Sequence, residues 1–128
     1  MALAIRDAKR LGSQLVLATD PDCDRVGIGV RTSEGDYRLL SGNETGVLLL
    51  DYVARRRRES GTMPAGPISV KTIVTSDLAG KVAQSYGIEM RDVLTGFKYI
   101  GEQIGLLEAD GGEGRFILGL EESYGYLS

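Results

Sequence analysis

The amino-acid sequence predicts a layered α/β/α domain with a mixed sheet over residues 41–128, preceded by a partial domain over residues 1–40. Three observations lead to this expectation. From residue 43 onward, segments with helical apolar spacing alternate with short apolar runs, which is typical of layered α/β proteins. Glycines follow the helical segments, as expected where helices end. Polar clusters follow the apolar runs, where the strands of such a sheet open into loops.

The partial domain is expected to contain a helix end, a strand and a hairpin. Apolar residues spaced three and four apart before Gly12 indicate a helix that stops at this glycine. The apolar run 15–18 ends near Pro21 and indicates a buried strand that opens into a loop. Two further short runs flank a turn-like segment, 33–36, and indicate a hairpin. The expected elements are a helix over 2–11, a strand over 15–18, and hairpin strands over 26–31 and 37–40.

The second part is expected to alternate helices and strands. Asn43 is the expected N-cap of its first helix, and Ser76 or Asp77 is the expected N-cap of its second. Lys71 stands among apolar residues of a strand, so we expect it at an outward-facing edge position. The expected elements are helices over 43–61, 78–86 and 97–107, and strands over 68–74, 88–94 and 116–120.

The loop after the first strand carries aspartates at every second position, Asp20, Asp22 and Asp24. In an extended backbone these three side chains project to the same side. Three carboxylates so close repel one another unless a cation lies between them. Because all the ligands are hard oxygens, Mg²⁺ or Mn²⁺ is favoured over Zn²⁺. Arg25 would be a fixed cation beside that metal, suited to a bidentate grip on phosphate.

The loop has three other interpretations. The first is a solvated acidic loop with no ligand, since such loops are common. A calcium EF-hand is excluded, because its sixth and twelfth positions need Gly and Glu, whereas this loop has Arg25 and Arg31. The third is an aspartyl phosphotransferase of the haloacid-dehalogenase type with Asp20 as nucleophile. It stays an alternative, although Asp24 stands where that family has Thr or Val.

The composition excludes several classes of function. A net charge of −3 gives no reason to expect nucleic acid or an anionic membrane as partner. The apolar stretches are far shorter than the roughly 18 residues of a membrane span. The single cysteine, Cys23, excludes an internal disulfide and fits a reducing cytoplasm. The chain has no histidine, which removes the usual general base and the usual zinc ligand.

Four motifs in order resemble the phosphoglucomutase/phosphomannomutase (α-D-phosphohexomutase) family, and most closely its bacterial phosphoglucomutase branch. The resemblance runs over essentially the whole chain. The motifs are the loop Asp-Pro-Asp-Cys-Asp-Arg at 20–25 with Val-Gly-Ile-Gly-Val after it, Gly-Asn-Glu at 42–44, Thr-Gly-Phe-Lys at 95–98, and Gly-Leu-Glu-Glu-Ser-Tyr-Gly at 119–125.

The resemblance implies a Mg²⁺-dependent isomerase that moves a phosphoryl group between the 1- and 6-positions of a sugar through a bisphosphate. Glucose 1-phosphate and glucose 6-phosphate are the first candidates for its phosphosugar substrate, with mannose, glucosamine and pentose phosphates as others. The implied roles are Mg²⁺ binding for Asp20, Asp22 and Asp24, phosphoryl contact for Arg25, sugar-hydroxyl contact for Glu121 and Ser123, and lining of the sugar site for Thr95, Gly96 and Lys98.

The chain departs from the family pattern in one respect. The family's nucleophile lies in a Thr-Ala-Ser-His-Asn-Pro-like loop, and no segment of this sequence resembles it. The phosphate-binding loop of the family's fourth domain is missing as well. We therefore expect a piece of a longer protein, with residues 1–40 from the end of the second domain and 41–128 from the third. Such a piece would need the remaining domains for turnover. The alternative is a free-standing metal-binding or scaffolding module without catalysis.

Overall fold

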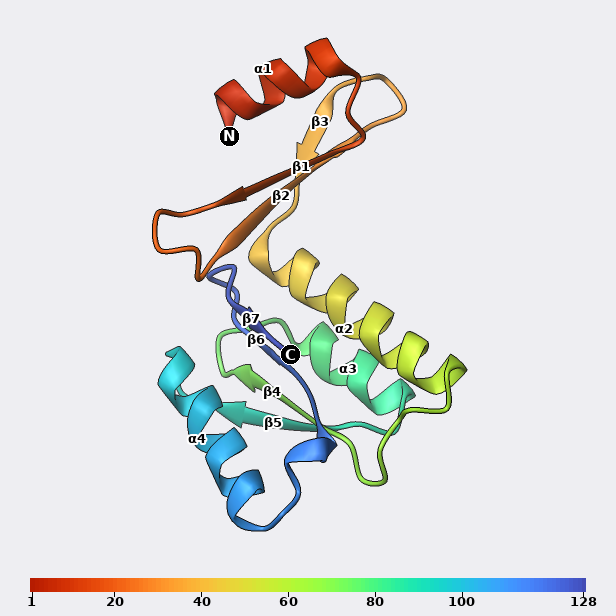
Figure 1. The fold of residues 1–128 in the computed structure, drawn as a ribbon, viewed down its shortest axis with the longest axis vertical. Helices are drawn as coiled ribbons and strands as arrows, with labels where there is room; N and C mark the ends of the chain where they lie inside the picture. The colour runs from red at the N-terminus through yellow and green to blue at the C-terminus, as the bar shows by residue number, and fades with distance from the viewer.

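The structure is a computed structural model that describes residues 1–128, and it has two parts that meet at the start of α2 (Figure 1). The first part comprises α1 (Ala2–Leu11), β1 (Leu15–Thr19), β2 (Val26–Arg31) and β3 (Tyr37–Leu39). The second comprises α2 (Gly42–Glu59), β4 (Ile68–Thr72), α3 (Asp77–Ser85), β5 (Glu89–Val93), α4 (Phe97–Ala109), the 3-10 turn η1 (Glu113–Arg115), β6 (Phe116–Leu120) and β7 (Tyr126–Leu127). No helix combines the length and apolar composition needed to cross a bilayer.

The first part is an antiparallel sheet in the order β1-β2-β3, with α1 packed against β1. The expected helix and hairpin are confirmed, and α1 ends at Gly12 in the left-handed conformation, with φ 67°. The expectation of a buried first strand is wrong. Only Val16 of β1 is buried, whereas Leu15 and Leu17 are 51% and 61% exposed. The reason is that α2, α3 and α4 all pack on the other sheet, so these side chains have no covering layer.

The second part is a mixed four-stranded sheet with helices on both faces. Its strand order is β5-β4-β6-β7, with β4 parallel to β5 and β6, and β7 antiparallel to β6. Figure 1 shows α2 and α3 on one face of this sheet and α4 on the other. Each face has its own apolar core. The larger core contains Leu50, Ala54, Ala79, Ala83, Ile88, Ile117, Leu118 and Leu120, and the smaller one contains Ile68, Val70, Ile100 and Leu107. The predicted α/β/α layering is confirmed.

This topology places three loops at one edge of the sheet. Because β4, β5 and β6 are parallel, the loops that follow them emerge from the same edge, where ligands of α/β proteins commonly bind. These loops are residues 73–76, 94–96 and 121–125. β7 was not expected from the sequence, and it turns the chain back along β6 after the last of these loops.

The start of α2 differs from the sequence expectation. Its N-cap is Ser41, whose hydroxyl accepts a hydrogen bond from the Glu44 N–H while the Glu44 carboxylate accepts one from the Ser41 N–H. This reciprocal pair is a capping box, and its Ser-x-x-Glu spacing was visible in the sequence. The Asn43 side chain is instead directed to another element, and its Oδ1 accepts a hydrogen bond from the Ser76 N–H at 2.8 Å. Ser76 is the N-cap of α3, as expected.

The expectation that Lys71 occupies an outward-facing edge position is wrong. Strand β4 lies between β5 and β6, and Lys71 is only 3% exposed. Its ammonium lies 3.1 Å from Asp92 Oδ1 and donates to the backbone carbonyl of Thr75 at 3.2 Å. A buried lysine is tolerated here because a carboxylate and main-chain oxygens surround its charge.

Candidate functional site

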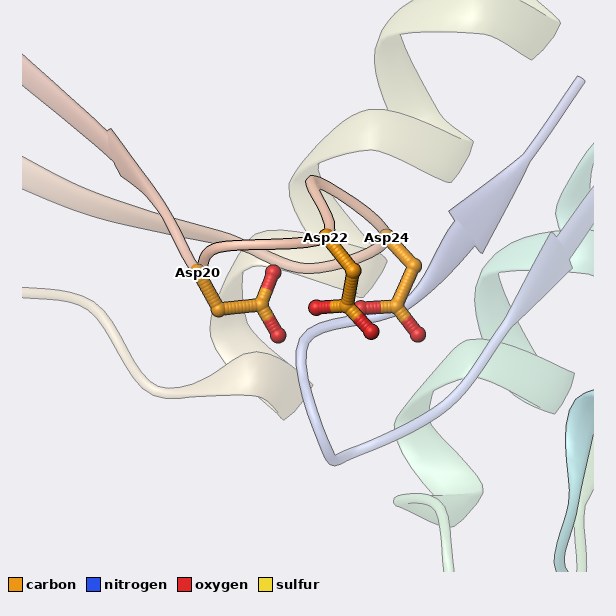
Figure 2. A group of neighbouring side chains, drawn as sticks. All are labelled: Asp20, Asp22 and Asp24. Carbon is orange, nitrogen blue, oxygen red and sulfur yellow. The ribbon is translucent and has the colours of Figure 1, made fainter.

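The acidic loop between β1 and β2 gathers three carboxylates. Oxygens of Asp20, Asp22 and Asp24 all lie within 4.8 Å of one another, and Figure 2 shows them on one side of the loop. The backbone reaches this arrangement by a turn rather than by an extended run. The Cys23 N–H donates to the Asp20 carbonyl at 3.1 Å, and Cys23 itself has φ 61°. Three convergent carboxylates are a donor set that fits a hard divalent cation.

Arg25 is bound to the first of these carboxylates. Its Nε lies 2.7 Å from Asp20 Oδ2, and its backbone N–H donates to Asp20 Oδ1 at 3.2 Å. The hydrogen bond from Arg25 lowers the pKa of Asp20, whereas desolvation, together with the hydrogen bond to Asp20, raises the pKa of Asp24. The two terminal nitrogens of the guanidinium make no hydrogen bond or ion pair, and the side chain is 56% exposed. Asp20 therefore holds Arg25 through Nε, and the two terminal nitrogens of the guanidinium remain available to bind an anion.

The loop after β6 contributes a further carboxylate, that of Glu121, which is only 7% exposed. Its Oε1 accepts a hydrogen bond from the Gly96 N–H at 2.9 Å, and its Oε2 accepts one from the Ser123 hydroxyl at 3.1 Å. The Glu121 N–H donates to the Gly125 carbonyl at 2.9 Å, which closes the loop. Glu121 and Ser123 thus form a hydrogen-bonded pair fixed to the start of α4.

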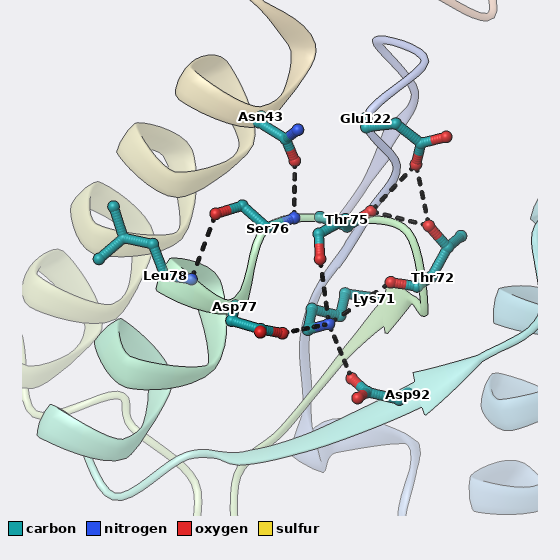
Figure 3. Close-up of polar contacts among 9 residues, drawn as sticks. All are labelled: Asn43, Lys71, Thr72, Thr75, Ser76, Asp77, Leu78, Asp92 and Glu122. Carbon is teal, nitrogen blue, oxygen red and sulfur yellow. Dashed lines mark hydrogen bonds and ion pairs between the residues drawn. The ribbon is translucent and has the colours of Figure 1, made fainter.

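Glu122 is directed away from this pair. Its Oε2 accepts hydrogen bonds from the hydroxyls of Thr72 at 2.9 Å and Thr75 at 3.2 Å (Figure 3). Both threonines are buried, and they stand at the end of β4 and in the loop after it. The two adjacent glutamates therefore bind different elements. Glu121 binds the start of α4, and Glu122 binds the end of β4 and the loop after it.

A cavity of about 310 Å³ joins the acidic loop to the loop after β6. The two loops are also bonded directly, because the Val26 N–H donates to the Tyr124 carbonyl at 3.2 Å. Gly125 permits the Phe97 ring of α4 to pack against the loop after β6, since a Cβ at Gly125 would lie 2.2 Å from that ring. The residues that line the cavity are Asp24, Arg25, Phe97, Glu121, Ser123 and Gly125. Two motifs about a hundred positions apart in the chain therefore face one space.

The Thr-Gly-Phe-Lys segment contributes less to this cavity than the sequence suggested. Gly96 reaches the site through its N–H on Glu121, and its φ of 127° is a conformation that favours glycine. Thr95 and Lys98 are exposed and do not line the cavity. The Lys98 ammonium lies 4.6 Å from the centre of the Tyr99 ring, in a cation–π contact.

Residues 41–128 match the family described as Phosphoglucomutase/phosphomannomutase, alpha/beta/alpha domain III. The chain belongs to the phosphoglucomutase/phosphomannomutase family. A phosphoglucomutase of Staphylococcus saprophyticus is 40% identical over 121 residues, which are 94% of this chain and 21% of that protein. A phosphoglucomutase of Staphylococcus epidermidis is 40% identical over 125 residues, which are 98% of this chain and 22% of that protein. The chain thus spans about a fifth of the length of these relatives.

Solved structures of other proteins share the fold of this chain. A phosphoglucomutase/phosphomannomutase family protein from Burkholderia thailandensis superposes with a TM-score of 0.68 at 18% identity, over 95% of this chain and 23% of that one. An N-acetylphosphoglucosamine mutase of Aspergillus fumigatus, in complex with GlcNAc-6P and magnesium, gives a TM-score of 0.61 at 16% identity, over 86% of this chain and 21% of that one.

Sequence reasoning missed two members of the candidate site. The motif at 95–98 contains Phe97 but implies no role for it, yet its ring packs against Gly125 and lines the cavity. Thr72 was treated as an ordinary strand residue, yet its hydroxyl binds Glu122. A signal for Thr72 was present, because a second threonine follows three positions later, in the loop after the same strand.

Proposed function

We propose that this chain is part of a Mg²⁺-dependent phosphohexomutase, to which it contributes the metal loop and the sugar-binding loop. In this proposal residues 1–40 are the end of the second domain and residues 41–128 are the third. The nucleophilic serine and a further phosphate-binding loop would come from other domains. The length of the staphylococcal relatives, of which this chain matches about a fifth, supports such additional domains.

The observation that carries the proposal is the cavity shared by Asp24, Arg25, Glu121 and Ser123. One wall has the Asp24 carboxylate and the Arg25 guanidinium, and the other has the Glu121 carboxylate and the Ser123 hydroxyl. A phosphosugar has a phosphate that suits the first wall and vicinal hydroxyls that suit the second. The whole protein would interconvert the 1- and 6-phosphates of a hexose through a bisphosphate, with glucose as the first candidate.

Each residue has a specific task in this reaction. Asp20, Asp22 and Asp24 would hold Mg²⁺, which when bound offsets negative charge on the transferring phosphoryl group. The free fork of Arg25 would bind two phosphoryl oxygens while Asp20 fixes its orientation. Glu121 and Ser123 would accept and donate hydrogen bonds to sugar hydroxyls and so orient the ring.

The first alternative, with Asp20 as a phosphorylated nucleophile, fits this geometry less well. A phosphoryl group on Asp20 would replace one of its two hydrogen bonds from Arg25, whereas a metal ion can share a carboxylate oxygen that already accepts a hydrogen bond. The second alternative is a binding module without catalysis. Trapping with beryllofluoride separates the first alternative, because only an aspartyl phosphotransferase would hold the reagent on Asp20.

The proposal is tested by assaying the full-length protein with glucose 1-phosphate, Mg²⁺ and catalytic glucose 1,6-bisphosphate. We expect glucose 6-phosphate to form, and Arg25→Leu to reduce its formation by at least about tenfold, the cost of a charge-assisted hydrogen bond. Arg31→Leu removes an exposed arginine at the far end of β2 and should leave the rate unchanged. Failure to turn over glucose, mannose and glucosamine phosphates alike would refute the proposal.

A further inference from the structure

The attachment of Glu122 involves three oxygens and two hydroxyl protons. Thr72 Oγ1 and Thr75 Oγ1 lie 2.8 Å from each other and 2.9 and 3.2 Å from Glu122 Oε2. Each hydroxyl has one proton to donate. Either both hydroxyls donate to the carboxylate, or one hydroxyl donates to the other, which then donates to the carboxylate. In each arrangement both buried hydroxyls take part in the attachment, and removing either one weakens it.

The turn that carries these hydroxyls is itself held by hydrogen bonds from Lys71 and to Asn43. Lys71 Nζ lies 3.2 Å from the Thr75 carbonyl and 3.5 Å from the Thr72 carbonyl, and its side chain is only 4% exposed. Asn43 of α2 accepts a hydrogen bond from the Ser76 N–H at the other end of the turn (Figure 3). Glu122 is therefore bound to the turn after β4, and this turn is fixed by Lys71 of β4 and by Asn43 of α2.

The backbone of Glu122 is equally confined. A Cβ on Gly42 would lie 1.9 Å from the Glu122 carbonyl oxygen. The first turn of α2 therefore approaches this peptide so closely that only glycine fits at position 42. Glu121 precedes Glu122 directly, and its own carboxylate binds Gly96 and Ser123 on the opposite side. A rotation of the loop that released Glu122 would therefore move Glu121 as well.

We propose that Glu122 is a positioning residue. By binding the hydroxyls of Thr72 and Thr75, it holds the loop after β6 in the orientation in which Glu121 and Ser123 face the cavity. Its effect on a sugar ligand rests on the function proposed above, whereas its effect on the orientation of Glu121 does not.

The Gly96 N–H offers a direct readout, because the hydrogen bond that Glu121 Oε1 accepts from it slows its exchange with solvent. Amide exchange is measured by NMR on the 128-residue chain, and kcat and KM are measured on the full-length protein. The variant is Thr72→Val with Thr75→Val, which preserves shape and removes both hydroxyls. The rescue variant is Thr72→Ser with Thr75→Ser. The control is Thr32→Val, because the buried Thr32 hydroxyl has no hydrogen-bond partner.

We expect the double valine variant to speed Gly96 exchange by about tenfold, while amides in the middle of α2 keep their rates. The double serine variant and Thr32→Val should behave like the wild type. In the full-length protein the double valine variant should lower kcat/KM by a similar factor. Unchanged Gly96 exchange, or equal acceleration in α2 and at Gly96, would overturn the positioning role. Faster Gly96 exchange with unchanged kcat/KM would support the positioning role and refute Glu121 as the sugar-binding residue.

Discussion

The carboxylate of Glu121 accepts a hydrogen bond at 2.9 Å from the backbone N–H of Gly96, which precedes it by 25 positions. This bond ties the loop after β6 to the first turn of α4. Gly96 is the N-cap of α4, and its own N–H is one of the free donors at the start of the helix. The Glu121 carboxylate accepts from this N–H, as the glutamate of a capping box does, and its charge suits the positive end of the helix dipole. Glu121 therefore stabilises a helix start and also presents Oε2 near the cavity, where Ser123 binds it.

These two roles of Glu121 are separable by mutation. In the full-length protein, Glu121→Ala should lose about 2–3 kcal/mol of transition-state stabilisation, the scale of a hydrogen bond to a charged group. Glu121→Gln keeps an acceptor for Gly96 but loses the charge, so it should lose less and keep the chain's melting temperature. Glu122→Gln should affect kcat/KM less than Glu121→Ala, because Glu122 is directed away from the cavity. Steady-state kinetics with glucose 1-phosphate measure all three, and wild-type turnover by Glu121→Ala would contradict the assignment.

The carboxylate cluster predicts metal binding by the chain alone. Asp22→Asn removes one of the three charges without changing the size of the side chain, and it should weaken Mn²⁺ binding by at least about tenfold. Binding to the wild-type chain should be weak, because Mg²⁺-type ions commonly complete their six ligands with phosphate or water. Calorimetry measures both affinities. Asp7→Asn, which changes an exposed aspartate on α1, is the control and should bind like the wild type. Equal affinity of Asp22→Asn and the wild type would remove these aspartates from the metal site.

The surroundings of the buried Lys71 ammonium lead to a prediction about the free energy of unfolding. Asp92 Oδ1 lies 3.1 Å from Lys71 Nζ, so Asp92→Asn leaves a buried cation with less compensation and should cost about 1–3 kcal/mol of unfolding free energy. Asp77 is 3.7 Å away and 96% exposed, and Asp77→Asn should cost less than about 1 kcal/mol. Urea denaturation of both variants tests the difference. Equal costs would show that the charge of Lys71 is not compensated mainly by Asp92.

Local sequence rules gave most of the fold. The spacing of apolar residues and the glycines after helices placed α1, α3 and α4 and the strands β2 and β6 close to their observed positions. The expectation from the sequence is wrong for the burial of two residues, Leu17 and Lys71. Leu17 lies on an uncovered face and Lys71 lies in a central strand, and both facts depend on which elements pack together rather than on the neighbouring residues in the sequence.

The candidate site was predictable in composition but not in arrangement. The motifs named Asp24, Arg25, Glu121 and Ser123, and the structure brings these four to one cavity. The contacts of Glu122 could not be predicted, because its partners stand about 50 positions earlier at the end of another strand. The aspartates converge through a turn and not through the extended backbone expected from their spacing, because the Cys23 N–H donates to the Asp20 carbonyl.

The capping box of α2 predicts how stability depends on pH. The backbone N–H of Ser41 donates to Glu44 Oε2 at 2.8 Å, and this bond, with a second from the Ser41 hydroxyl, lowers the pKa of Glu44. A carboxyl whose pKa is lower in the folded state than in the unfolded state stabilises the fold above its unfolded pKa. That contribution is lost as the pH falls through the folded value. The melting temperature of the wild type should therefore exceed that of Glu44→Gln at neutral pH, and the difference should shrink between about pH 5 and about pH 3. Glu34→Gln is the control, because the exposed Glu34 side chain makes no hydrogen bond, and its melting curve should follow the wild type at every pH. A difference between wild type and Glu44→Gln that stayed constant down to about pH 3 would mean that the Glu44 carboxylate contributes through packing and not through its charge.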